Sequence, residues 1–354
     1  MKIDSLFTDK AYSFEEAGDP TDDCEFAAKA LEKLRPNFKL EKISLASVED
    51  HFDVFVLQNT EGEKFKLKIS LSDSEKVLKR ESTALRSCQC SNTPSFIAYG
   101  TVKVGEEVTC LLTKIFNAES IRDHGRSIII QNLPDLLNAY SLVFDNRRVK
   151  NTYKKVLSSF LQEFNPKNCL PKDVIGAFQS YTNYPLCEEF LLVLKGQISA
   201  AAQELVPIFN HKCHGSLSLD SLFYGPQGFY FDSLSTVCMG HPFIDFVDLI
   251  LEMGVKTEDE GLLLDSFCEK IGVPREDTLY NRIYHLQLRK KLGELIIAYI
   301  KEVYLYDSFR YQKILYIADT FSHCYERFCC IDIFKENRDF IMKTICEPIF
   351  GVKA

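Results

Sequence analysis

The spacing of apolar residues changes once along this 354-residue chain, and that change limits the folds open to it. Between residues 38 and 116, apolar and polar residues alternate in short runs such as "FKLEKIS", "FDVFVLQ" and "KFKLKIS". Alternation is typical of strands that bury one face. Beyond Phe116, apolar residues recur three and four positions apart almost to the end, which is typical of amphipathic helices. The sequence therefore predicts an α+β protein with two lobes, a small antiparallel-sheet N-lobe and a large, mainly helical C-lobe.

The same patterns predict where the parts of the chain begin and end. Residues 1–37 form an N-terminal segment with one helix, and residues 38–116 form the N-lobe, a sheet plus one helix at 73–88. Residues 117–354 form the helical C-lobe, which the glycine-punctuated segment 211–233 interrupts. That segment favours a β-hairpin with loops.

Charge and hydropathy exclude two classes of partner. The formal net charge of -8 gives no general attraction for nucleic acid or for an anionic membrane surface. No apolar run approaches the ~20 residues that span a bilayer. The basic run "RIYHLQLRKK" at 282–291 is expected to be the solvated face of a helix. We therefore expect no nucleic-acid partner and no membrane partner; the sequence does not indicate an oligomeric state.

Cysteine usage favours a reducing compartment. The chain has 13 cysteines, an odd number, and its first residues lack the apolar core of a secretion signal. We therefore expect reduced thiols and a cytoplasmic protein. "HKCH" at 211–214 leaves one metal alternative open, with His211, Cys213 and His214 as ligands, although no fourth ligand is evident.

One helix places a carboxylate on an apolar stripe. In "SDSEKVLKRESTALRSC", Glu81 lies four positions from Val77 and from Leu85, and so shares their face. A buried carboxylate needs a partner, and the preceding strand offers Lys64, Lys66 and Lys68 on one face. The sequence predicts a Lys68–Glu81 ion pair; the alternative is that Glu81 lies at the edge of the stripe, in water.

The order of these motifs resembles the aminoglycoside phosphotransferase and choline kinase family, which has a protein-kinase-like fold. The strand with Lys68, the helix with "RES", "TPSFIAYGTV" and "LLTKIF" follow the order of the family's small lobe. "CHGSLSLDSLFY" resembles its catalytic loop, H-G-D-L-x-x-x-N, and "GFYFDS" resembles the strand that delivers a metal-binding aspartate. "GHPFIDFVDLI" resembles the following G-D-P-x-x-D-L-A stretch, so that the resemblance covers roughly residues 38–253.

The resemblance implies roles for individual residues. Lys68 would hold the α and β phosphates of ATP, Glu81 would hold Lys68, and Asp232 would bind magnesium. The segment 111–117, with Ile115, would be the hinge that contacts adenine.

Two further roles concern the catalytic loop. His214 would orient that loop by hydrogen bonding, and Asp245 would be a structural or substrate-side carboxylate.

The chain departs from the family where the chemistry is done. Ser216 stands at the usual position of the catalytic aspartate, and Ser221 at that of the asparagine that binds the second metal ion. A serine hydroxyl is no base near neutral pH. Asp220 would replace the missing carboxylate if the loop shifts by one residue. The stretch "SLASVEDHFDVF", where a glycine turn would cover the phosphates, has no glycine and carries Glu49 and Asp50.

Two hypotheses of function follow from the resemblance and the departures. The first is a degenerate phosphotransferase, inactive or nearly so, that binds a small molecule, a peptide or a protein partner at the cleft between the lobes. The alternative is an active ATP-dependent phosphotransferase on a small hydroxyl or amino compound, a sugar or a peptide side chain. ATP and magnesium are the implied cofactors; in a third case Lys68, Glu81 and Asp232 only stabilise the fold and nothing binds.

Overall fold

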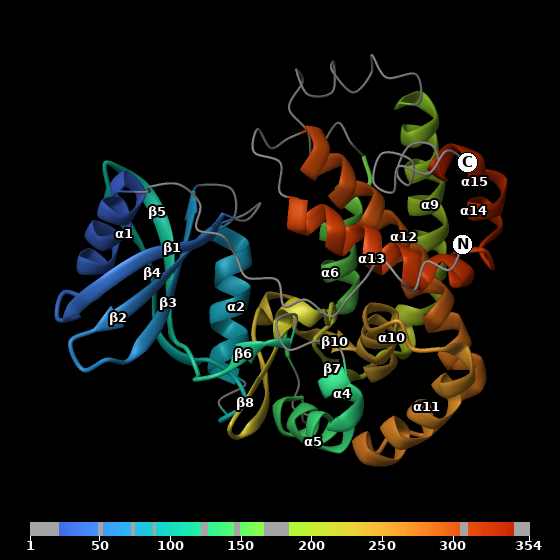
Figure 1. The fold of residues 1–354 in the computed structure, drawn as a ribbon, viewed down its shortest axis with the longest axis horizontal. Coiled ribbons are helices and arrows are strands. Elements are labelled where there is room, and N and C mark those ends of the chain that lie inside the picture. The colour runs from blue at the N-terminus through green and yellow to red at the C-terminus, as the bar shows by residue number, and fades with distance from the viewer. Residues whose placement is uncertain are drawn as a thin grey trace. The chain divides into compact units, whose positions relative to one another are not determined.

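The computed structural model describes residues 21–48, 52–71, 75–87, 90–121, 127–144, 149–165, 184–304 and 311–342 (Figure 1). The chain forms two compact units. The first, called the sheet unit below, is Met1–Val149 with Leu219–Val237; the second, the helical unit, is Lys150–Ser218 with Cys238–Ala354. The sequence places residues 117–149 and 219–237 in the C-lobe, whereas their contacts place them in the sheet unit.

A five-stranded antiparallel sheet forms the main layer of the sheet unit, in the order β1-β2-β3-β5-β4. The strands are β1 (Leu40–Val48), β2 (Asp53–Asn59), β3 (Lys64–Leu71), β4 (Ser95–Val104) and β5 (Glu106–Lys114). Strand β3 is central, because β2 and β5 flank it. The predicted antiparallel N-lobe sheet is therefore confirmed.

Helix α1 (Thr21–Leu34) packs against this sheet (Figure 1). Its residues Ala27, Ala30 and Leu31 are buried in one cluster with inward-facing residues of the strands. Those strand residues include Phe55, Leu57, Phe65, Leu67, Ile69, Val108 and Leu112. The period of two in each strand and the helical spacing in α1 bring their apolar faces together.

Two further elements of the sheet unit position its polar residues. Helix α2 (Glu75–Ser87) follows β3 directly and packs against the short 3₁₀ turn η5 (Leu234–Thr236). A three-stranded sheet runs in the order β6-β8-β9, with β6 (Glu119–Ser120), β8 (Leu222–Gly225) and β9 (Gly228–Phe231). The hairpin β8–β9 is the one predicted within 211–233, and Gly228 takes the positive φ of 94° that the turn requires.

Strand β9 is tied to the rest of the sheet unit on two sides. Helix α5 (Leu133–Val143), preceded by α4 (Ser127–Gln131), packs on it, with Tyr140 edge-on to Phe231. The Phe231 N–H donates to the carbonyl of Asn92 at 2.8 Å, and the Asn92 side chain donates to the Phe229 carbonyl at 2.8 Å. These contacts fix the end of β9, after which Asp232 follows.

The helical unit contains the remaining elements. Its longer helices are α6 (Tyr153–Gln162), α9 (Tyr184–Leu205), α10 (Pro242–Met253), α11 (Thr257–Ile271), α12 (Asp277–Tyr304) and α13 (Tyr311–Phe328). Its short elements are the 3₁₀ turn η3 (Val206–Ile208), the paired strands β7 (His211–Cys213) and β10 (Cys238–Gly240), and the helices α14 (Asp332–Glu336) and α15 (Arg338–Ile341). The mainly helical C-lobe that the sequence predicts is confirmed in this unit.

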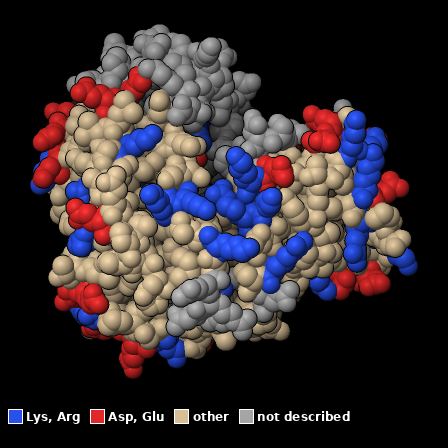
Figure 2. All heavy atoms as spheres, turned by 180° about the vertical axis from the view of Figure 1, so that it is seen from behind, with Lys and Arg blue, Asp and Glu red and all other residues tan. Residues whose placement is uncertain are grey.

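The surface carries both signs of charge despite the net charge of -8. In the view from behind, acidic and basic side chains both occur on each unit (Figure 2). Among the helices that the structure describes, none is long and apolar enough to cross a membrane.

The prediction that the basic run 282–291 is a solvated face is wrong for its last two residues. Lys290 and Lys291 lie inside the helical unit, where α12 packs on α10 and α13. Lys291 contacts Glu252 at 2.7 Å and Glu294 at 3.1 Å, and Lys290 contacts Glu294 at 3.0 Å. Opposite charges on neighbouring helices override the usual solvation of a basic run, because each buried ammonium has a buried carboxylate as partner.

We predict that Lys291→Met lowers the free energy of unfolding by about 3 kcal/mol, since the buried Glu252 carboxylate loses its ammonium partner. Urea unfolding measures the loss. Lys270→Met, at an exposed lysine of α11, is the matched control and should change stability by less than about 1 kcal/mol. Equal stability of the two variants would contradict the structural role of the buried cluster.

Candidate functional site

The centre of the sheet unit holds a buried ion pair between β3 and α2. The Lys68 ammonium lies 2.8 Å from Oε1 and 3.0 Å from Oε2 of Glu81. The two side chains are 5% and 2% exposed. The structure thus contains the pair that the sequence predicts, and the alternative of a solvated Glu81 is not what it shows. The pair holds the Lys68 ammonium at a fixed point on the sheet.

A second lysine of β3 contacts the other predicted carboxylate. Lys66 donates a hydrogen bond to Oδ2 of Asp232, the residue that follows β9. The Lys66 ammonium also lies 5.7 Å from the centre of the Phe223 ring on β8. Residues 66 and 68 lie on one face of β3, so both ammonium groups belong to the same part of the sheet unit.

The charge of Asp232 depends on these lysines. Burial by itself would raise the pKa of the Asp232 carboxyl. The ammonium groups of Lys66 and then Lys68 outweigh burial, and hydrogen bonds from Lys66 and from the Ser233 N–H add to their effect. The pKa of Asp232 is therefore held well below its usual range, and the carboxylate is ionised at neutral pH.

The backbone beside Asp232 adopts an unusual conformation. Ser233 has a φ of 56°, in the left-handed region, and it is the one residue other than glycine with a positive φ among the residues described. Its N–H donates to Oδ1 of Asp232 at 2.7 Å. A serine in this region is strained relative to glycine, and such residues cluster at functional sites.

Ser221 and Asp220 lie at the start of the β8–β9 hairpin. Both belong to the 3₁₀ turn η4 (Leu219–Ser221). The Ser221 side chain is buried, and its carbonyl accepts a hydrogen bond from the Asp232 N–H at 2.9 Å. Asp220 is exposed. Of these two, the structure brings Ser221 next to Asp232.

These groups are a poor match for a magnesium ion. One oxygen of Asp232 accepts from Lys66 and the other from Ser233, and the second predicted ligand, Ser221, has a hydroxyl in place of an amide oxygen. Magnesium requires several hard oxygens in near-octahedral geometry. Within the described part of the chain, no cluster of three or more His, Cys, Asp or Glu residues could hold a metal ion, the "HKCH" residues included.

The first half of the segment that resembles the catalytic loop, residues 213–218, belongs to the helical unit. The N–H groups of His214 and Gly215 donate to the two carboxylate oxygens of Asp245, at 2.6 and 2.7 Å. Gly215 has a φ of 86°, and half-buried Ser216 follows it. Asp245 lies in the first turn of α10, so its side chain ties the backbone of the loop to this helix. Asp245 therefore holds the backbone of the loop, which is a structural role.

Ile115 lies just beyond the end of β5. It is half-buried, and its N–H donates to the Lys64 carbonyl at 3.2 Å. This bond ties Ile115 to the neighbouring strand β3, and its predicted contact with adenine stays a prediction. Glu49 and Asp50 of the glycine-free stretch lie outside the described residues.

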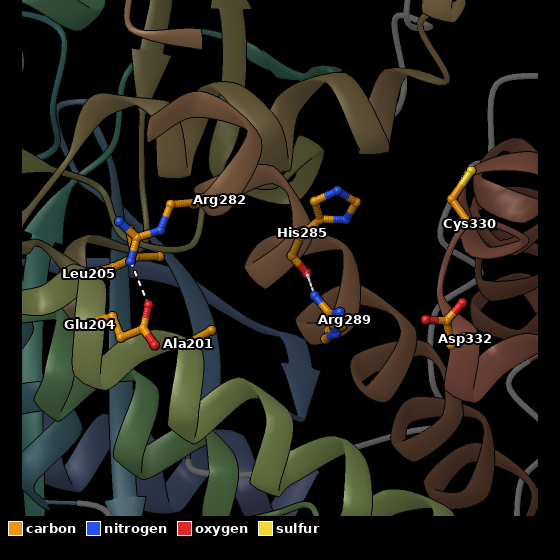
Figure 3. Close-up of a pocket in the computed structure, with 8 residues that line it drawn as sticks. All are labelled: Ala201, Glu204, Leu205, Arg282, His285, Arg289, Cys330 and Asp332. Carbon is orange, nitrogen blue, oxygen red and sulfur yellow. Dashed lines mark hydrogen bonds and ion pairs between the residues drawn. The ribbon is translucent and has the colours of Figure 1, made fainter. Parts of the chain in front are cut away.

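An open pocket occurs in the helical unit; the basic run 282–291 lines part of it, and none of the residues predicted to bind a nucleotide or a metal does (Figure 3). It is lined by Ala201, Glu204, Leu205, Arg282, His285, Arg289, Cys330 and Asp332. Its arginines already have partners: Arg282 pairs with Glu204 at 2.7 Å, and Arg289 donates to the His285 carbonyl at 3.0 Å. Because its cations are engaged within the protein, the pocket gives no indication of a ligand.

Sequence reasoning assigned no role to Lys66. The signal was present, because alternation along β3 places Lys66 on the same face as Lys68. What the alternation could not show is that β9, more than 150 residues later, delivers Asp232 to that lysine.

We predict that the stability advantage of wild type over Asp232→Asn depends on pH. The folded-state pKa of Asp232 is depressed, so its ionised form contributes stability that is complete above the ordinary aspartate pKa of about 4 and is lost as the pH falls below it. Urea unfolding between neutral and acidic pH should show the difference narrowing below about pH 4.

Asp53→Asn on β2 is the control for this measurement. Burial, and then the nearby Asp23, raises the pKa of Asp53. Wild type should therefore gain stability relative to Asp53→Asn as the pH falls, which is the opposite sign. A difference for Asp232→Asn that is constant with pH, or that grows in acid, would contradict the depressed pKa.

Comparison with known proteins gives matches at the level of structure. No family model matches the sequence, and no curated protein matches it by sequence. An amicoumacin kinase solved with AMP-PNP and Ca²⁺ has a TM-score of 0.57 at 11% identity, over 86% of this chain and 93% of its own. A choline kinase from Streptococcus pneumoniae has a TM-score of 0.55 at 11% identity, over 85% and 99% of the two chains.

A third similar structure is an aminoglycoside phosphotransferase from Streptomyces rimosus, solved with ADP and streptomycin. Its TM-score is 0.51 at 16% identity, over 74% of this chain and 98% of its own. Identities this low establish the fold and leave the activity open. The fold expected from the order of the motifs is confirmed: the chain has the protein-kinase-like fold of the aminoglycoside phosphotransferase and choline kinase family.

Proposed function

We propose that this protein is a pseudokinase, inactive or nearly inactive in phosphoryl transfer, that binds a ligand at the lysine-rich face of β3. The observation that carries the proposal is the ion pair between Lys66 and Asp232. In the fold to which this chain is similar, an aspartate at this position would bind magnesium. Here a protein ammonium group occupies that carboxylate.

The catalytic loop supports the same conclusion. Ser216 stands at the position of the general base, and a serine hydroxyl does not accept a proton near neutral pH. Loss of the base alone removes a factor of roughly 10² to 10⁴ in rate. Phosphoryl transfer depends mainly on positioning and charge neutralisation, so this loss by itself would leave a slow enzyme.

The losses act together at the metal positions. Ser221 is a weaker ligand than an amide, and Asp232 is already neutralised by Lys66. The stretch 44–55 has no glycine with which to bring backbone N–H groups onto a phosphate. With the base and the glycine turn absent, one metal ligand replaced by Ser221 and the other paired with Lys66, little or no turnover is expected.

The Lys68–Glu81 pair, which the chain retains, supports the binding of a ligand. The Lys68–Glu81 pair holds an ammonium group in place at a low cost of reorganisation, since Glu81 is buried and fixed by α2. By fold-level analogy with the similar structures solved with ADP and AMP-PNP, a nucleotide is the first ligand to test. A peptide or a protein partner is the next.

The reduced state of the thiols fits a protein of the cytoplasm. None of the nine cysteines whose side chains the structure describes forms a disulfide, and we propose a cytoplasmic location on this basis and on the composition.

We predict that the wild-type protein releases no more phosphate from ATP than Asp232→Ala does, in either Mg²⁺ or Mn²⁺, because the base is missing and Asp232 is paired with Lys66. ³¹P NMR of long incubations measures this with water as the acceptor. Circular dichroism checks that the variant is folded.

The opposite result would favour the alternative function. Turnover by wild type that disappears in Asp232→Ala would identify an active phosphotransferase. Asp220, exposed one residue before Ser221, would then be the first residue to test as the base.

A further inference from the structure

We propose that Lys66 takes the place of a divalent cation, so that Lys66 and Lys68 together bind the phosphates of a nucleoside di- or triphosphate without a metal ion. The inference rests on the proposed function, which it deepens by naming the ligand class and its metal independence. It starts from the poor match between Asp232 and magnesium described above.

The two lysines form a built arrangement rather than a chance cluster. They lie two residues apart on the central strand β3, and each ammonium group contacts a different buried carboxylate. Lys68 contacts Glu81 of α2, and Lys66 contacts Asp232 after β9. Two separate elements thus hold the two positive charges on one face of the strand.

The available hydrogen-bond donors favour an anion over a cation at this place. Lys66 neutralises Asp232 as Lys68 neutralises Glu81. A magnesium ion approaching Asp232 would meet the Lys66 ammonium as a like charge. A phosphate would meet two ammonium groups, for which charge-assisted hydrogen bonds are among the strongest available.

Lys66 keeps the capacity to donate to a ligand. Its ammonium carries three N–H donors, and its contact with Asp232 in the described residues uses one. The Lys66 side chain is 18% exposed, compared with 5% for Lys68, so it is the more accessible of the two. A phosphate can therefore reach Lys66 while the contact with Asp232 is kept.

Aromatic rings beside Lys66 favour a nucleotide over inorganic phosphate. Phe223 lies beneath the Lys66 ammonium, and Phe116 contacts Phe223 edge-on at 5.7 Å between ring centres. Phe116 and Phe223 are both half-buried, and Phe116 also stacks on the more deeply buried Tyr230 at 4.4 Å. Partly exposed rings offer a stacking surface to a base.

Calorimetric titration of the full-length protein with ATP tests the proposal, once in excess EDTA and once in Mg²⁺. Wild type should bind ATP in EDTA with a Kd within about threefold of its value in Mg²⁺. Lys66→Met should weaken metal-free binding by about tenfold or more, because a charge-assisted hydrogen bond is lost. Lys66→Arg should restore most of the affinity.

Two controls separate the contribution of the Lys66 charge from that of the aromatic rings. Lys42→Met, at an exposed lysine of the edge strand β1, should leave binding in EDTA unchanged. Pyrophosphate, which has the charge but no base, should bind more weakly than ATP if the aromatic surface contributes. Thermal unfolding of each variant shows whether it is folded.

Two results would overturn the inference: no heat at millimolar ATP in either buffer, or binding that appears only with Mg²⁺ and survives Lys66→Met. The first would mean that the Lys66–Asp232 pair closes the site. Neither result depends on turnover, which tests the proposed function separately. A protein that releases no phosphate but binds ATP only with Mg²⁺ would refute this inference and leave the proposed function standing.

Discussion

The site described here depends on the contact between Lys66 and Asp232, because it decides which ion the buried carboxylate can accept. A carboxylate taken out of water must be neutralised, and the protein does so with a side chain of its own central strand. This one contact contributes to the low pKa of Asp232, joins the β8–β9 hairpin to the five-stranded sheet, and compensates the negative charge that would attract a metal ion. The proposed loss of catalysis and the proposed metal-free binding are two consequences of the same contact.

Paired burial of charge is repeated elsewhere in the chain, with a different outcome. In the helical unit, Lys290 and Lys291 of α12 meet carboxylates of α10 and of their own helix, and Arg327 of α13 contacts the buried Glu260 at 2.6 Å. These groups join helices to one another, and we assign them stability rather than chemistry. The lysines of β3 differ because Lys66 is partly exposed and lies beside half-buried aromatic rings. Buried charge therefore indicates a binding site only where solvent and a suitable surface reach it.

Local patterns in the sequence were enough for the elements of the fold, whereas the Lys68–Glu81 pair and the kinase-like arrangement also needed the family resemblance. Alternation located β1 to β5, helical spacing located α2 and the main helices, and the position of Glu81 on an apolar stripe required a basic partner. The rest depends on contacts between distant segments, which a local pattern does not contain. The partner of Lys66 follows β9, and half of the contacts of Lys290 and Lys291 are to α10. Residues 219–237 belong to the sheet unit although they follow a helical region. In the sequence, a solvated basic run and a buried pair of lysines have the same pattern, and only the carboxylates of the neighbouring helix distinguish them.

The central claim is that Lys66 supplies the positive charge on Asp232 that a metal ion would otherwise supply. ¹³C NMR of the side-chain carboxyl carbons, in metal-free buffer, measures the pKa of Asp232 directly. The account predicts a pKa well below the ordinary value of about 4 in the wild-type protein, and a clear rise in Lys66→Met. An ordinary pKa that does not respond to Lys66→Met would contradict it, and would return Asp232 to the role of a carboxylate available to magnesium.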